Sequence, residues 1–139
     1  KNSKNNFFYK LFNNKNKKIY IVDDEFISPC SANFVSDVTL KLIKNITLVK
    51  KKILHLTPNG SGTWFYYAKY LTKLLNRKKI IYPIKSDNFN KNNAKRPKNS
   101  IINSNKIQKI LKVKFYNVKR YIYDEYKPNV IEWKEKELY

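Results

Sequence analysis

Three consecutive acidic residues, Asp23, Asp24 and Glu25, stand out chemically in a chain that is otherwise strongly basic. They follow a β-branched and aromatic run, residues 18–22, which is typical of a short strand. Carboxylates at a strand end could bind Mg²⁺ or polarise a substrate hydroxyl. They could equally form a turn in which the Asp side chains bond to nearby backbone groups. The residues alone leave both interpretations open.

Arg96 is a second candidate, because it precedes Pro97 near the end of a long polar segment, residues 85–100. Only three of the 30 basic residues are arginines. A guanidinium group binds two oxygens of a phosphate or carboxylate at once, whereas an ammonium group acts as a point charge. An arginine kept among so many lysines indicates an anion contact. The alternative is a surface arginine that bonds to a backbone carbonyl.

Two further motifs favour structural roles. The turn Gly60-Ser-Gly62 lies between a strand-like and a helix-like run, as in dinucleotide-binding sites, but Phe65 stands where the third glycine would be. We interpret it as a glycine turn in which Thr63 caps the next helix. Tyr123 and Lys127 have the spacing of a short-chain dehydrogenase pair. A chain with 11 tyrosines contains such spacings by chance, and the helix is expected to stop before Pro128.

The single cysteine, Cys30, excludes an intramolecular disulfide and a cysteine-based zinc site. The single histidine, His55, excludes a histidine-rich metal site, and it alternates with apolar residues as a structural strand residue does. The two residues lie in different elements without a third group to orient them. A Cys–His nucleophile is therefore not expected.

The net charge of +20 over 139 residues favours phosphate-rich partners, and a basic nucleic-acid-binding module is the competing functional class. The lysines are scattered, however, and arginines are few, so the charge predicts no specific nucleic-acid partner. With 42% hydrophobic residues the chain can form a core, and its apolar runs are too short to cross a membrane. It begins at Lys1 and contains no methionine, which indicates the end of a longer chain.

The secondary-structure elements that must position these residues predict an α/β fold with about three short strands and five helices. The predicted strands are residues 18–22, 53–57 and 80–84. The predicted helices are residues 7–12, a helix capped by Asn33, one capped by Thr63, a short one capped by Asn103 or Ser104, and residues 117–126. Residues 127–139 form a C-terminal tail. Three strands are few for a sheet, which also indicates that part of the fold lies elsewhere.

The motifs, taken in order, resemble one family. They are Asn5-Asn-Phe7, Ile21-Val-Asp-Asp-Glu-Phe-Ile-Ser-Pro29, Ile53-Leu-His-Leu-Thr57, Gly62-Thr-Trp64 and Lys95-Arg-Pro97 followed by Asn99-Ser100. Residues 1–126 resemble the C-terminal, substrate-binding portion of the dTDP-4-dehydrorhamnose reductases, which are Rossmann-type extended short-chain dehydrogenases. Three positions depart from the family pattern: Glu25 replaces Gln, Ile27 replaces Gly and Cys30 replaces Thr.

The resemblance implies reduction of dTDP-4-dehydro-L-rhamnose to dTDP-L-rhamnose by NADPH or NADH. Asp24, Glu25 and Pro29 would shape one wall of the dTDP-sugar pocket, Arg96 would face the diphosphate, and Asn6 would make a polar contact. The catalytic residues and the cofactor site would lie in an N-terminal domain that this sequence does not include, so the fragment alone would be inactive.

The resemblance also implies a cytoplasmic enzyme with no membrane association, and leaves open a homodimer of the full protein. A third interpretation, beside the reductase portion and the nucleic-acid-binding module, is an inactive gene remnant. The Gly-to-Ile departure at Ile27 favours it, because glycine permits backbone conformations that isoleucine does not.

Overall fold

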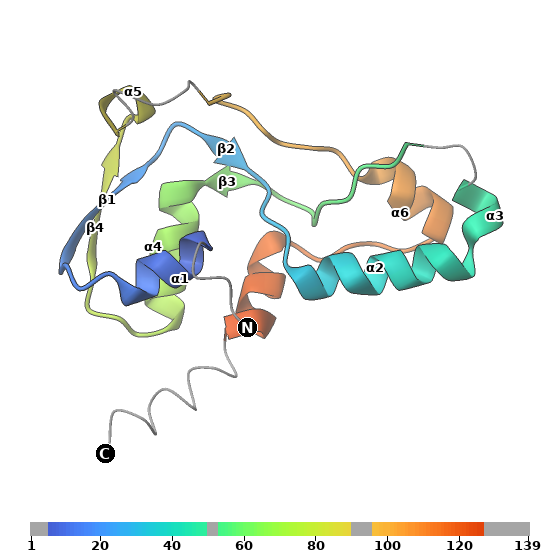
Figure 1. Cartoon of the computed structure of the whole chain (residues 1–139), viewed down its shortest axis with the longest axis horizontal. Coiled ribbons are helices and arrows are strands. Elements are labelled where there is room, and N and C mark those ends of the chain that lie inside the picture. The colour runs from blue at the N-terminus through green and yellow to red at the C-terminus, as the bar shows by residue number, and fades with distance from the viewer. Residues whose placement is uncertain (1–5, 50–52, 90–95, 127–139) are drawn as a thin grey trace, which may run out of the picture.

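The computed structural model describes residues 6–49, 53–89 and 96–126. In these ranges the elements are α1 (Phe7–Asn13), β1 (Lys18–Val22), β2 (Phe26–Ile27), α2 (Ala32–Lys44), α3 (Ile46–Val49), β3 (Gly62–Thr63), α4 (Trp64–Leu74), β4 (Ile80–Ile84), α5 (Ser86–Phe89) and α6 (Asn105–Leu111). Residues 118–126 are also helical. Figure 1 shows β1, β4, α1 and α4 at one end of the molecule and α2, α3 and α6 at the other. The expected α/β class is confirmed.

β1 and β4 form a two-stranded parallel sheet, in which Tyr20 lies opposite Tyr82. Parallel neighbours need a long crossover, which here includes α2, α3 and α4. One face of the sheet carries Ile19, Ile21 and Ile81, which pack toward α4. The other face carries the stacked rings of Tyr20 and Tyr82, with centroids 5.4 Å apart. β2 and β3 pair separately as a two-residue antiparallel ladder.

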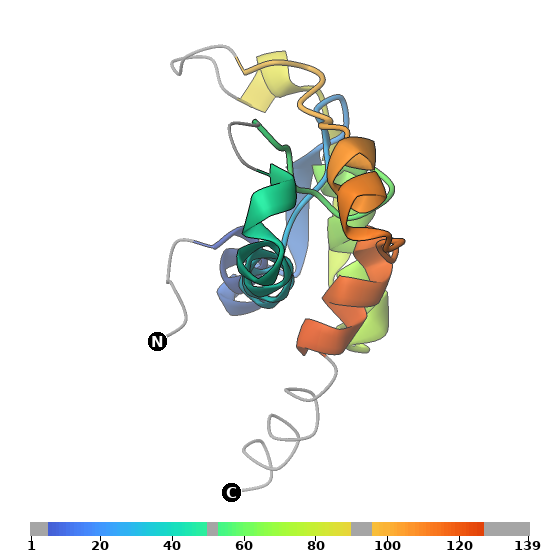
Figure 2. The same cartoon turned by 90° about the vertical axis from the view of Figure 1, so that its right-hand side faces the viewer.

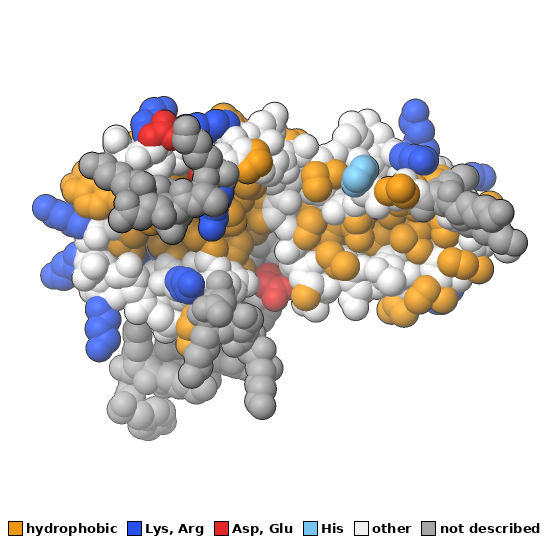
Figure 3. All heavy atoms as spheres, turned by 45° about the horizontal axis from the view of Figure 1, so that its top comes forward, with side chains coloured by type: hydrophobic (Ala, Val, Ile, Leu, Met, Phe, Trp, Pro, Cys, Tyr) orange, Lys and Arg blue, Asp and Glu red, His pale blue; other side chains and the backbone are white. Residues whose placement is uncertain are grey.

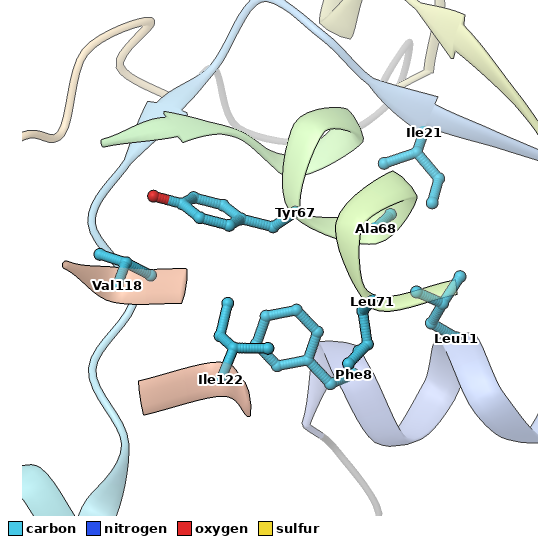
Figure 4. Close-up of a cluster of buried hydrophobic side chains, with 8 residues drawn as sticks. All are labelled: Phe8, Leu11, Ile21, Tyr67, Ala68, Leu71, Val118 and Ile122. Carbon is cyan, nitrogen blue, oxygen red and sulfur yellow. The ribbon is translucent and has the colours of Figure 1, made fainter. Parts of the chain in front are cut away.

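A cluster of eight buried side chains, the first cluster, holds this end together (Figure 4). It consists of Phe8, Leu11, Ile21, Tyr67, Ala68, Leu71, Val118 and Ile122. α4 lies at its centre, because Tyr67, Ala68 and Leu71 recur with helical spacing and are at most 1% exposed. As expected, Thr63 caps α4 and accepts a hydrogen bond from the Tyr66 N–H at 3.1 Å. The first cluster therefore joins the sheet to α1, α4 and the helix at residues 118–126.

A smaller group, the second cluster, lies between α2 and α6 and consists of Phe34, Val38, Ile107 and Phe115. Leu54 and Leu56 pack against it from the segment that precedes β3. The opposite face of α2 leaves Leu40 58% and Ile43 61% exposed. α2 thus packs one apolar face against α6. It also carries large apolar side chains on the opposite face, which is exposed to solvent.

Several sequence expectations are corrected. Residues 53–57 form no strand, because no other strand pairs with them among the described residues. α2 is capped by Ser31 rather than Asn33, since the Ser31 hydroxyl accepts the Phe34 N–H at 3.1 Å. The polar segment 85–100 includes the short helix α5. The expected tail, residues 127–139, lies outside the described residues.

Candidate functional site

The carboxyl ends of β1 and β4 lie at the same edge of the small sheet, because the two strands are parallel. The Asp23 N–H donates to the Ile84 carbonyl at 3.0 Å and extends this pairing into the loop after β1. In open α/β sheets, ligands bind outside the carboxyl ends of the strands. The acidic residues after β1 and the polar residues after β4 therefore meet at the edge where a ligand is expected.

Asp24 occupies the centre of this edge. One carboxylate oxygen accepts the Ser86 N–H at 2.9 Å, and the other accepts from Lys98 Nζ at 2.7 Å. Lys98 Nζ also donates to the Ser86 hydroxyl, and Asp87 lies 3.6 Å away. The hydrogen bond from Lys98 holds the pKa of Asp24 below its usual value. Its side chain is only 17% exposed, so Asp24 is committed mainly to other protein groups.

Backbone pairing brings the segment that contains Arg96 to the same edge. The Phe26 N–H donates to the Lys98 carbonyl at 2.8 Å, and the Ser100 N–H donates to the Phe26 carbonyl at 2.9 Å. The side chain of Arg96 is exposed and contacts no carboxylate among the described residues. The N–H and the carbonyl of Phe26 therefore both hold the loop in place. The guanidinium group of Arg96 stays exposed, so that it could bind an anion.

The other predicted site residues are placed differently. Glu25 is 5% exposed and Pro29 is partly buried. Asn6 accepts the Phe8 N–H at 2.8 Å and so caps α1, which both views place well away from α5 (Figures 1 and 2). The structure brings Asp24 together with the Arg96 loop but keeps Asn6 apart from both.

The acidic run shows no cluster of metal-ligating side chains among the described residues. Within the described ranges, no three His, Cys, Asp or Glu side chains come close enough to share a metal ion. Asp23 instead accepts a hydrogen bond from the Thr63 hydroxyl, which links the end of β1 to the start of α4. The expectation of Mg²⁺ finds no support, and the alternative of structural hydrogen bonds accounts for Asp23 and Asp24.

Sequence reasoning missed Lys98 and Ser86. Lys98 is one of 27 lysines, and nothing in its local pattern marks it out; only its position two residues after Arg96 could have suggested a role. Ser86 lies two residues after β4, as Asp24 lies two residues after β1, and only the parallel pairing of the strands makes that equivalence meaningful.

The Gly60-Ser-Gly62 turn does not fit a dinucleotide. Gly60 has φ +89°, and a Cβ atom there would lie 2.4 Å from Asn117 Nδ2. A Cβ atom at Gly62 would lie 2.5 Å from Tyr66 Cδ1. The glycines thus make room for side chains of this chain rather than for a pyrophosphate. Lys127 of the Tyr123–Lys127 spacing lies outside the described residues, so the expectation that this spacing arises by chance stays a prediction.

A shallow groove of about 540 Å³ continues from the Pro29 loop along α2. It is lined by Cys30, Ser31, Ala32, Val35, Ser36, Thr39 and Leu40. Loss of solvent around the sulfur raises the pKa of the Cys30 thiol, and Cys30 Sγ contacts the Leu56 carbonyl at 3.6 Å. A raised pKa opposes thiolate formation, so the groove holds no activated nucleophile.

A small parallel sheet, helices packed on one face and polar loops gathered at the carboxyl ends of the strands define an α/β fold, and in such folds ligands bind at this edge of the sheet. The chain belongs to the RmlD substrate binding domain family, and the model of this family matches residues 1–127. No curated protein matches it in sequence. None of the helices described here is long and apolar enough to cross a membrane.

Solved structures show the same fold. A dTDP-4-dehydrorhamnose reductase from Bacillus anthracis, in complex with NADP, is 24% identical with a TM-score of 0.70 and 88% of this chain covered. dTDP-4-dehydrorhamnose reductases from Clostridium acetobutylicum and Yersinia enterocolitica are 22% and 23% identical, with TM-scores of 0.75 and 0.74, and in each comparison 86% of this chain is covered. The chain spans 42% of the length of each of these proteins.

Proposed function

We propose that this chain is the substrate-binding portion of a dTDP-4-dehydrorhamnose reductase, which reduces the 4-keto group of dTDP-4-dehydro-L-rhamnose. The observation that carries the proposal is the loop at residues 96–100, held against Phe26 at the carboxyl edge of β1 and β4. An exposed guanidinium group in a fixed loop suits the diphosphate of a nucleotide-sugar.

In this proposal Asp24 is a positioning residue. It neutralises Lys98 and ties α5 to the loop after β1, so that Arg96 is presented from a held backbone. Pro29 shapes the entrance to the α2 groove. Glu25 and Asn6 play smaller parts than the sequence suggests, because one is buried and the other caps α1.

The cofactor belongs to the portion of the enzyme outside this sequence. The Bacillus anthracis relative was solved with NADP, and the glycine turn of this chain is filled by its own side chains. NADPH or NADH would supply a hydride to the sugar ketone when bound there. The residues described here would bind and orient the sugar nucleotide and would exclude water from one side of it.

The test uses this chain joined to, or mixed with, the remaining portion of the Clostridium acetobutylicum reductase. Arg96→Lys should raise KM for the dTDP-sugar about 5- to 150-fold, which corresponds to ~1–3 kcal/mol for a charge-assisted hydrogen bond. KM for NADPH should not change. Arg120→Lys is the matched control, because Arg120 is also exposed but bonds to Asp124 on its own helix.

The role of Arg96 would be contradicted if Arg96→Lys raised the KM values for the dTDP-sugar and for NADPH by the same factor. It would also be contradicted if neither KM changed. Failure of dTDP-rhamnose to bind at all to the assembled protein would contradict the proposed function itself.

A further inference from the structure

The outer face of the β1–β4 sheet, which points away from α4, carries exposed aromatic rings. Tyr20 is 57% and Tyr82 is 38% exposed, and their stacked rings lie opposite each other on the two strands. Ile80 is 51% exposed on the same face, because alternate residues of a strand share a face. Exposed rings held on paired strands offer a flat apolar surface to a planar ligand.

Parallel pairing gathers basic residues beside these rings. The Ile80 N–H donates to the Lys17 carbonyl at 2.8 Å, and Lys79 Nζ donates to the Asn14 carbonyl. The segments that precede β1 and β4 therefore lie side by side, and Lys18 faces the same way as the rings because it lies opposite Ile80. Together they form a set of cations, the basic edge, which consists of Lys15, Lys17, Lys18, Arg77, Lys78 and Lys79. Every lysine of this set except Lys79 is exposed.

The sequence around the basic edge contains no acidic residue. Asp and Glu are absent from residues 1–22 and 38–86, which include both strands and the segments before them. Burial and the nearby charge of Arg77 lower the pKa of Lys79, which indicates that cations lie close together here. Figure 3 shows Lys and Arg side chains, in blue, projecting from this end of the molecule. The basic edge therefore attracts anions.

We propose that the basic edge and the rings of Tyr20 and Tyr82 bind single-stranded nucleic acid without sequence preference. Such sites combine cations that follow the phosphate backbone with aromatic rings on which successive bases stack, and in some of them a sheet carries the rings. The scarcity of arginine agrees with a site that does not read bases, because arginine is the residue that most often recognises guanine. This face is separate from the edge proposed for the dTDP-sugar, since the two lie at opposite ends of β1 and β4.

Other anionic partners match this face less well. Proteins that bind an anionic membrane surface insert the apolar face of a helix, whereas these rings lie on strands. The bases of duplex DNA are held inside the helix, where the rings cannot reach them. Only unpaired bases can use both the rings and the cations.

The principal experiment measures the fluorescence anisotropy of a labelled oligothymidylate, about 15 nucleotides long, as the whole 139-residue chain is added. Oligoadenylate and oligouridylate should bind with a similar Kd. A duplex of the same length should bind more weakly, although it carries more charge, because its bases cannot stack on the rings. Tyr20→Ala and Tyr82→Ala should each weaken binding of the single strand about 5- to 150-fold, whereas Tyr20→Phe should not. Tyr116→Ala is the matched control, because its ring is 67% exposed but lies outside the sheet.

The dependence of binding on salt tests the cations separately. A triple variant with Lys17→Gln, Lys18→Gln and Lys78→Gln should reduce the slope of log affinity against log salt by about two, since each phosphate contact on a single strand contributes ~0.7. The matched control variant replaces three exposed lysines of α2 and α6 with glutamine, namely Lys41, Lys44 and Lys109. It removes the same charge and should leave the slope nearly unchanged. Exposed lysines contribute little to folding, so this comparison stands even where a tyrosine variant does not fold.

The inference is overturned if the duplex binds as tightly as the single strand, or if both triple variants reduce the slope equally. Either result would show attraction to the net charge alone. It is also overturned if dTDP-rhamnose displaces the oligonucleotide, which would show one shared site, or if phosphatidylserine vesicles bind with the same dependence on Tyr20 and Tyr82. A chain that binds the oligonucleotide as expected, but whose assembled form fails to bind dTDP-rhamnose, would support this inference and contradict the proposed function.

Discussion

The two hydrophobic clusters differ in how completely the chain encloses them. The first cluster is surrounded by the sheet, α1, α4 and the helix at residues 118–126, and Ala68 and Leu71 are fully buried there. The second cluster has four buried side chains between α2 and α6, and one of its borders is the unpaired segment 53–57. One end of the molecule thus has the larger core, whereas the smaller core at the other end is bordered by a segment without backbone pairing among the described residues. We expect the first cluster to contribute more to stability than the second.

Truncation in the two clusters should show the largest contrast. Leu71→Ala should lower the free energy of unfolding by about 2–5 kcal/mol, because a fully enclosed site cannot collapse around the lost atoms. Ile107→Ala, at 1% exposure in the second cluster, should cost less, since its thinner surroundings can relax. Urea unfolding of both variants measures the difference. Equal losses would show that the second cluster is as rigid as the first.

The helix caps give a smaller contrast of the same kind. Thr63 caps α4 and also donates to Asp23, whereas Ser31 caps α2. Thr63→Ala should therefore cost about 1–2 kcal/mol and Ser31→Ala about 1 kcal/mol or less. Thr63→Ser keeps both hydrogen bonds and is the control. A larger loss at Ser31 would reverse the comparison between the two ends.

The smallest expected effect is a dependence of stability on pH at the edge of the sheet. Because the pKa of Asp24 is lowered in the folded protein, its contribution is present above the ordinary carboxyl pKa of 3.8. It is lost as the pH falls through the lowered value. Asp24→Asn should therefore weaken the loss of stability in acid, measured by urea unfolding between pH 7 and pH 3.

Lys98→Gln should have the same effect on the acid dependence, since the hydrogen bond from Lys98 is the main cause of the shift. The double variant should then differ little from either single variant. Additive effects of the two changes would show that Asp24 is stabilised independently of Lys98.

Local patterns were enough to predict much of the first cluster and its sheet. The periodic apolar residues of α4, the β-branched runs of β1 and β4 and the cap at Thr63 were all visible in the sequence. Helical and strand periods are properties of neighbouring residues, and an N-cap acts within three residues. The resemblance also depended on ordered local motifs, and the match to the RmlD substrate binding domain family over residues 1–127 supports its coarser part.

The candidate site depended on distant contacts that no local pattern contains. Asp24 and Lys98 are 74 residues apart, and only the parallel pairing of β1 with β4 and the ladder at Phe26 bring them together. The same reason explains why Ser31, rather than Asn33, caps α2: the entry of the chain into a helix depends on how the preceding loop packs. The roles of Asn6, Asp24, Glu25, Pro29 and Arg96 in substrate binding stay predictions.

Residues 53–57 show most directly where the sequence reaches its limit. By itself the sequence determined their strand-like alternation, because side chains on an extended backbone point to opposite sides in turn. It could not determine whether a strand forms, since a strand is completed by hydrogen bonds to a neighbour that lies elsewhere. Only the tertiary structure showed that the Ile53 and Thr57 carbonyls accept hydrogen bonds from the α6 region, whereas the Leu56 carbonyl meets Cys30 Sγ.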